Sequence, residues 1–158
     1  MKAKLALVLL GLCLIVQSTA ASGETLYPVQ GPLAAQAPPP VIKAAFHGSS
    51  LGSFSLVQAN GESFQGKWAS LIPSFVNTRT PETSASYLPQ PNIAFAWDAV
   101  YGPGYFVAQI LGTGIRQVVV TGNQGTVIQV ECRYSLSPSP GCIGVAVDSK
   151  GNIYKVAW

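Results

Sequence analysis

The fold is decided by residues 142–158, CIGVAVDSKGNIYKVAW. Two short apolar runs flank the loop Ser149-Lys150-Gly151. A three-residue loop of this kind combines a type I turn with a left-handed residue, a conformation that glycine adopts without a Cβ penalty. This loop sets Asp148 opposite Asn152, which places small residues of one strand opposite large residues of the other. The segment therefore predicts an antiparallel hairpin that is buried largely on both faces.

The same loop chemistry occurs twice more, at Ala59-Asn60-Gly61 and at Asn123-Gln124-Gly125. In the first hairpin it pairs Gln58 with Glu62. One face of that hairpin then carries Phe54, Leu56, Phe64 and Trp68. The structural turn glycines are thus predicted to be Gly61, Gly125 and Gly151. Short alternating runs between such turns predict an all-β fold, either a small antiparallel sandwich or a partly open barrel built of hairpins.

Two cysteines follow the middle hairpin. Cys132 continues the apolar face of Ile128 and Val130, and a loop with two prolines leads to Cys142. A bridge between them would close a short loop, for which chain entropy assigns roughly 2.5 to 3 kcal/mol. Because the two cysteines lack the close spacing that lowers a thiol pKa, we predict a structural disulfide between Cys132 and Cys142.

The first 20 residues have the order of a secretory signal peptide. Lys2 and Lys4 precede an apolar run over 5–16, and small residues follow up to Ala20, the expected cleavage site. The net charge of +3 includes these two lysines, so cleavage leaves a mature charge of +1 and an even pair of cysteines. We expect an exported protein, periplasmic or secreted, with no membrane span after cleavage. Lipid attachment through Cys13 and association with an outer membrane are the alternatives.

Residues 21–45 are rich in proline and alanine, which predicts a flexible tether before an all-β domain over 46–158. Within the domain, the apolar runs at 93–100 and 105–111 are expected to be strands joined by a tight turn at Gly102-Pro103-Gly104. Residues 73–91 hold four prolines and are expected to form a long irregular connection, whose role the sequence leaves open.

Groups suited to catalysis are scarce. His47 is the only histidine, which excludes metal sites that need two histidines. Glu62 and Asp148 flank hairpin loops, where acidic residues commonly solvate a turn or accept a turn hydrogen bond, and Asp98 is expected on the outward face of a strand. We therefore predict no catalytic residue, no metal and no cofactor. A hydrolase is the more distant alternative.

The distribution of charged and aromatic residues indicates which kinds of partner the protein could bind. Only 9% of residues are charged, and the basic ones are dispersed, so nucleic acid is not an expected partner. Trp97, Tyr101 and Tyr105 gather around the turn at 102–104, where exposed aromatic rings could stack on a sugar or on a partner chain. The alternative is that these three rings pack into the core or its rim.

Three resemblances bear on the class. The alternating C-terminus that ends in Trp158 resembles the last strand of bacterial outer-membrane barrels, although eight strands of about 10 residues would use most of the domain. Residues 60–68, NGESFQGKW, resemble a single MORN-type repeat. Residues 112–158 resemble small exported bacterial proteins without an assigned activity, through Gly125-Thr126, the Cys132 region and the segment DSKGNIY at 148–154. This last resemblance implies export and a β-fold, and it supplies no catalytic residues.

Taken together, these features predict an exported, non-enzymatic protein of the cell envelope or the medium. The alternative is a small-ligand or glycan-binding β-module that uses the aromatic residues near the 102–104 turn. The partner is open, with an envelope protein or a glycan as the candidates.

Overall fold

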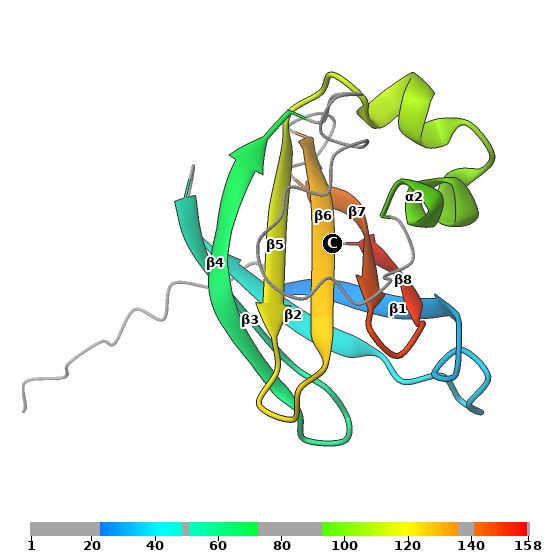
Figure 1. Ribbon diagram of the computed structural model, residues 1–158, viewed down its shortest axis with the longest axis vertical. Helices are drawn as coiled ribbons and strands as arrows, with labels where there is room; N and C mark the ends of the chain where they lie inside the picture. Colours follow the sequence, from blue (N-terminus) through cyan, green and yellow to red (C-terminus); the bar gives the residue numbers. More distant parts are fainter. Residues whose placement is uncertain (1–22, 49–50, 73–92, 136–140, 158) are drawn as a thin grey trace, which may run out of the picture.

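Eight antiparallel strands close into a barrel in the computed structural model, which describes residues 23–48, 51–72, 93–135 and 141–157 (Figure 1). Each strand pairs with its neighbours in sequence, and β8 pairs with β1 to complete the ring. The strands are β1 (Gly23–Gln30), β2 (Ile42–His47), β3 (Leu51–Val57), β4 (Ser63–Leu71), β5 (Ile115–Thr121), β6 (Val127–Ser135), β7 (Gly141–Asp148) and β8 (Ile153–Ala157). The all-β prediction is confirmed, and the barrel is closed rather than partly open.

Several expectations fall outside the described residues. They concern the signal peptide over 1–20, Cys13, the connection at 73–91 and the position of Trp158.

The three predicted hairpins have the predicted register. Leu56 lies opposite Phe64, Val120 opposite Ile128, and Ala146 opposite Tyr154. The loop glycines have positive φ values, as the left-handed position of a three-residue loop requires. The values are 81° for Gly61, 89° for Gly125 and 83° for Gly151. Local turn chemistry therefore sets the register of these strand pairs.

The barrel interior is a packed apolar core. Alternate residues of every strand point inward, and with eight strands the enclosed space is just wide enough for side chains to fill it. The inward apolar residues include Leu26, Ile42, Phe46, Phe54, Leu56, Phe64, Trp68, Val118, Ile128, Val130, Tyr154 and Val156. On β6 and β7 the disulfide between Cys132 and Cys142 joins this core, with the two Cα atoms 5.7 Å apart.

The expectation of a tether over 21–45 is wrong for the two strands inside that range. β1 pairs with β8 and with β2, and Leu26 and Ile42 are buried in the core. The prolines hid this pattern: Pro28 lies at a register shift of β1, where a missing N–H is tolerated, and the others lie in the connection between the strands. The alternation in each strand covers only a few residues, so the proline and alanine content of the segment is the stronger local signal and predicts a tether.

The expectation of two strands at 93–100 and 105–111 is also wrong. Ile93–Tyr101 is the α-helix α2, and Phe106–Ile110 is the π-helix η1. The apolar run of α2 fits either period, but three alanines within it favour a helix, and a closed barrel has no free edge for another strand. The turn at 102–104 is present, with positive φ at Gly102 and Gly104.

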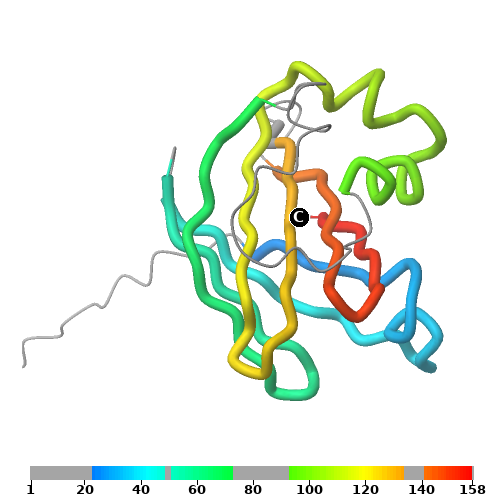
Figure 2. Tube along the Cα trace, viewed as in Figure 1, coloured from blue at the N-terminus to red at the C-terminus, as the bar shows by residue number. Residues whose placement is uncertain are grey.

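The helix α2 covers the outer face of the β7–β8 hairpin, and η1 packs against α2 (Figure 2). Trp97, Phe106 and Ile110 pack with Val145 and Ile153, whose side chains point out of the barrel. This hairpin is therefore buried largely on both faces, as predicted, with Ile143 and Lys155 exposed on the outer one. None of the helices in the described residues is long and apolar enough to cross a membrane.

Candidate functional site

The aromatic cluster consists of Trp97, Tyr101 and Tyr105, which the structure brings together. The ring centroids are 5.5 Å apart for Trp97 and Tyr101, 6.0 Å for Trp97 and Tyr105, and 4.8 Å for the two tyrosines, all in stacked orientation. Trp97 and Tyr101 share a face because they are one helical turn apart on α2, not because they share a strand face.

The Trp97 side chain is held in place by the buried carboxylate of Glu131. The indole is fully buried, and its Nε1 donates to Glu131 Oε2 at 2.9 Å. Glu131 Oε1 accepts from Gln117 Nε2 at 2.8 Å and from Gln129 Nε2 at 3.4 Å. Burial raises the pKa of Glu131 above its ordinary value, although these three hydrogen bonds act in the opposite direction. The alternation of β6 directs Glu131 away from the apolar face of Ile128 and Val130, and nothing local in the sequence indicates that α2 covers that outer side.

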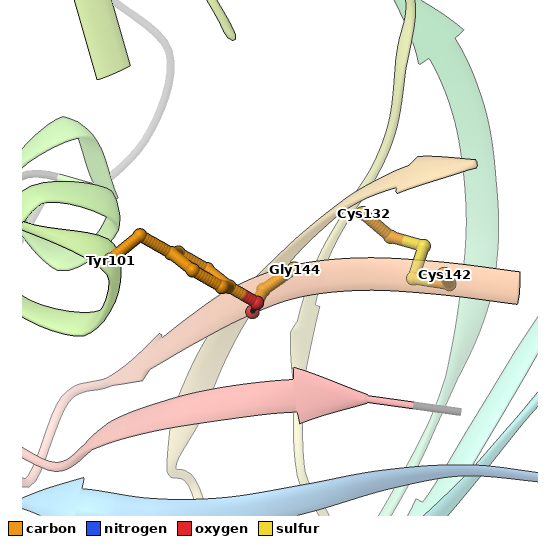
Figure 3. Close-up of a disulfide and its surroundings, with 4 residues drawn as sticks. All are labelled: Tyr101, Cys132, Cys142 and Gly144. Atoms are coloured by element: carbon orange, nitrogen blue, oxygen red, sulfur yellow. Dashed lines mark hydrogen bonds between the residues drawn. A yellow bond between two sulfur atoms is a disulfide. The ribbon is translucent and has the colours of Figure 1, made fainter. Parts of the chain in front are cut away.

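Tyr101 is fixed through its hydroxyl group. Figure 3 shows its ring reaching from α2 to β7, where the hydroxyl donates to the Gly144 carbonyl oxygen at 3.2 Å. Burial raises the pKa of Tyr101 to about 12, so the hydroxyl stays protonated near neutral pH. The Lys155 ammonium lies 5.8 Å from the centre of the same ring.

A groove of about 340 Å³ opens beside the aromatic cluster. Partly exposed Tyr101 and Tyr105 form one wall, and the turn at 102–104 with Ala108 and Gln109 forms the rest. Asp98 was expected on a strand but lies in α2. Its Oδ1 accepts from the N–H of Phe106, the first residue of η1, at 2.9 Å. The groove can therefore receive a flat molecule against rings that are already held in place.

A second group of functional side chains lies inside one end of the barrel. This polar layer is made of residues that flank the three hairpin loops: Gln58, Glu62, Thr126, Asp148 and Asn152, all buried. Glu62 and Asp148 do not solvate their turns, since both are 0% exposed, but Asp148 accepts turn hydrogen bonds, which was the other expectation for it. The alternation of the strands indicates this burial. Glu62 has the same parity as the inward Phe64, and Asp148 the same as the inward Ala146, so both side chains point into the barrel.

Glu62 accepts three hydrogen bonds in the polar layer. Oε1 accepts from the Thr126 N–H at 2.9 Å, while Oε2 accepts from Thr126 Oγ1 at 2.7 Å and from Lys150 Nζ at 3.2 Å. Burial alone would raise its pKa, but these bonds and the charge of Lys150 hold the pKa of Glu62 below its ordinary value. Gly122 leaves room for the carboxylate, because a Cβ there would lie 2.6 Å from Glu62 Oε1.

Asp148 accepts four hydrogen bonds beside it. Oδ1 accepts from the N–H groups of Lys150 and Asn152 at 2.9 and 3.0 Å. Oδ2 accepts from Asn152 Nδ2 at 2.9 Å and from the Tyr154 hydroxyl at 2.6 Å. Burial, and then the bond to Asp148, raise the pKa of Tyr154, so it remains a donor. Asn152 Oδ1 in turn accepts from the Leu33 N–H at 2.8 Å, which ties the β1–β2 connection to the layer.

His47 plays a backbone role. Its carbonyl oxygen accepts from Trp68 Nε1 at 3.0 Å, and its side chain is exposed at the end of β2. Across the described ranges, no group of three or more His, Cys, Asp or Glu side chains is arranged to hold a metal ion.

These features define a class: a closed, eight-stranded up-and-down β-barrel with an apolar interior, a polar layer at one end and a helical cover on one side. No family model, no curated protein and no solved structure matches the chain.

Proposed function

We propose that this is an exported, non-enzymatic protein of the cell envelope or the medium that binds a sugar ring or a similarly flat molecule against Tyr101 and Tyr105. The observation that carries this proposal is the groove at the aromatic cluster, in which two partly exposed rings are stacked on the buried Trp97.

The rings are held before a ligand arrives. The Trp97 bond to Glu131 and the Tyr101 bond to Gly144 fix two of the three side chains. A fixed side chain loses little conformational freedom on binding, so a larger part of the contact energy contributes to affinity. An aromatic face supplies apolar area for a ring, and the exposed Gln109 amide at the groove supplies a hydrogen-bonding group for ring hydroxyls.

Three buried carboxylates support the non-enzymatic part of the proposal. Glu62, Asp148 and Glu131 each accept hydrogen bonds on both oxygens. A carboxylate that is engaged in this way has a structural use, whereas a general acid or base must reach the substrate proton.

Ligand binding is tested by titrating the purified mature protein with chitotetraose and with maltotetraose while tryptophan fluorescence is followed. We expect saturable binding of one of them with a Kd below about 1 mM. Tyr105→Ala should weaken binding at least about tenfold, and Tyr105→Phe should keep it, because stacking needs the ring. Tyr27→Ala, which removes a 43% exposed tyrosine on the outside of β1, is the matched control. Equal effects of Tyr105→Ala and Tyr27→Ala, or no binding of either sugar, would contradict the proposal.

Export is tested by intact mass spectrometry of the protein from periplasm and medium, with and without reductant. We expect a chain that begins near Ala21 and carries no free thiol. A chain that keeps residues 1–20, or a diacylglyceryl mass on Cys13, would overturn this part.

A further inference from the structure

A cavity of about 430 Å³ lies at the mouth of the barrel, outside the polar layer. It is bounded by the β1–β2 connection, the β3–β4 loop and the β7–β8 loop. Its volume falls in the range of small-molecule sites, and the mouth of a barrel is a common place for such sites.

The cavity wall combines an apolar surface with carboxamides. Leu33, Pro40 and Ile42 are among its apolar residues. The carboxamides are Gln36, Gln58, Asn60 and Asn152. Two of them are held in place: Asn60 Oδ1 accepts from the Glu62 N–H at 3.0 Å, and Asn152 is bonded to Asp148 and to Leu33. The wall therefore presents fixed neutral polar groups beside an apolar surface.

Gln58 is the exception among these amides, because it is 7% exposed and none of the described residues accepts a hydrogen bond from its Nε2. An unsatisfied buried donor costs free energy, so most buried amides have a partner. Gln58 is one of the residues that line the cavity, and the terminal torsion of a glutamine is broad, so its amide is free to rotate there. An acceptor in the cavity would satisfy this donor.

Charge selects among ligands that offer an acceptor. Lys150 is the charged residue of the cavity wall, and its ammonium is already paired with Glu62. The polar layer beside the cavity holds the two buried carboxylates of Glu62 and Asp148, against the one half-exposed ammonium of Lys150. An anion would meet a net negative surrounding. A cation would find both carboxylates engaged by other donors.

We propose that the barrel-mouth cavity is a binding site for a small neutral molecule with an apolar body and an amide or other carbonyl head, which accepts a hydrogen bond from Gln58. The apolar body packs against Leu33, Pro40 and Ile42. This site is separate from the groove at the aromatic cluster, and it stands whether or not that groove binds a sugar.

The test uses three probes with one chain length and three head groups: octanamide, octanoate and octylammonium. Each is titrated into the ¹⁵N-labelled mature protein, and ¹H–¹⁵N spectra report the Gln58 side-chain NH₂ and the Leu33 backbone N–H. We expect octanamide to shift both signals saturably and to bind at least about fivefold tighter than either charged probe. Octylammonium has no acceptor for the Gln58 donor, and one hydrogen bond is worth about that factor, while octanoate brings a negative charge close to the buried carboxylates of the polar layer.

A pair of variants assigns the effect to Gln58. Gln58→Leu removes the donor and keeps the size, and Gln65→Leu makes the same change on the exposed outer face of β4 in the same hairpin. Gln58→Leu should weaken octanamide binding about fivefold while the thermal unfolding midpoint stays level or rises, because an unpartnered buried donor is lost. Gln65→Leu should leave the affinity for octanamide unchanged.

Four results would overturn the proposal. These are no saturable shift with any probe, shifts confined to the groove at Tyr101 and Tyr105, tighter binding of octanoate or octylammonium, and an unchanged affinity for octanamide in folded Gln58→Leu. Should Gln58→Leu not fold, Gln58→Met replaces it with the same expected outcomes.

Discussion

Glu62 and Glu131 are both buried carboxylates beside hairpin strands, but they lie on opposite faces of the barrel wall and have opposite pKa directions. Glu62 points into the barrel, where the Thr126 N–H and hydroxyl and the Lys150 ammonium hold its pKa low. Glu131 points outward under α2, where only the neutral donors Trp97, Gln117 and Gln129 reach it and burial raises its pKa. Similar burial thus gives opposite results, because a cation and a backbone N–H are present in one case and not in the other.

This difference separates two uses of a buried acid. Glu62 connects three hairpin loops and is stabilised in its charged form. Glu131 orients the indole of Trp97 and bears an unfavourable cost for its charge. The predictions below test the two sites from the largest expected effect to the smallest.

Glu62→Ala is expected to cause the largest loss, about 3 kcal/mol in the free energy of unfolding at pH 7, since it leaves the buried Thr126 donors without an acceptor. Urea unfolding followed by far-UV circular dichroism measures it. Because the folded pKa of Glu62 is lowered, its contribution is present above the unfolded value near 4.5 and is lost as the pH falls through the folded pKa. A difference from wild type that grows as the pH falls would contradict this role.

Trp97→Phe is expected to cost about 2 kcal/mol by the same measurement. The smaller ring leaves a gap under α2, and Glu131 loses the indole N–H. Phe95→Leu is the control, because Phe95 lies on the same helix with 55% of its surface exposed and should change the free energy by less than about 0.5 kcal/mol. Equal costs for the two variants would show that the Trp97 bond to Glu131 contributes nothing.

Lys150→Met is expected to cost about 1 kcal/mol or less. Half of the Lys150 side chain is exposed, so water screens its ion pair, and Glu62 keeps both donors of Thr126. The loss should shrink in 1 M salt. A cost as large as that of Glu62→Ala would mean that the cation, and not Thr126, is the main partner of Glu62.

Glu131→Gln is expected to have the smallest effect at pH 7, about 0.5 kcal/mol or less, since the amide oxygen still accepts from Trp97 and Gln117 can turn its own amide. The folded pKa of Glu131 is raised, so wild type gains stability as the pH falls towards 4.5 and loses it as the pH rises through the folded pKa. The variant lacks this dependence and should therefore compare better with wild type at pH 8 than at pH 4.5. Parallel pH profiles would contradict the assignment.

The hairpins could be predicted from sequence because their register depends on local loop chemistry at Gly61, Gly125 and Gly151. The disulfide followed from the phase of Cys132 in the same pattern. Closure could not be predicted in this way, because β1 and β8 are far apart in sequence and Pro28 obscures the alternation of β1.

The sites divide along the same line. Glu62 has the same strand parity as the inward Phe64, and Asp148 the same as the inward Ala146, so the alternation predicts that both acids point inward. The preference of acidic residues for turns indicates the opposite, solvent-facing position. The partner of Glu131 was not readable, because it depends on α2 packing across the barrel wall. Residues four apart lie on one face of a helix and also on one face of a strand. The proximity of Trp97 and Tyr101 could therefore be predicted, although they lie on a helix and not on the predicted strand.

The pairing order has a consequence for how the chain folds. Within the described residues, all strand pairings except one join strands that are consecutive in the strand order, and only β1 with β8 brings together the two ends of the barrel. Contacts between distant residues carry the larger loop-closure entropy, and they are favourable only after the intervening chain is ordered. The sheet should therefore grow hairpin by hairpin, and the pairing of Leu26 with Val156 should be the late step that removes the last two open edges.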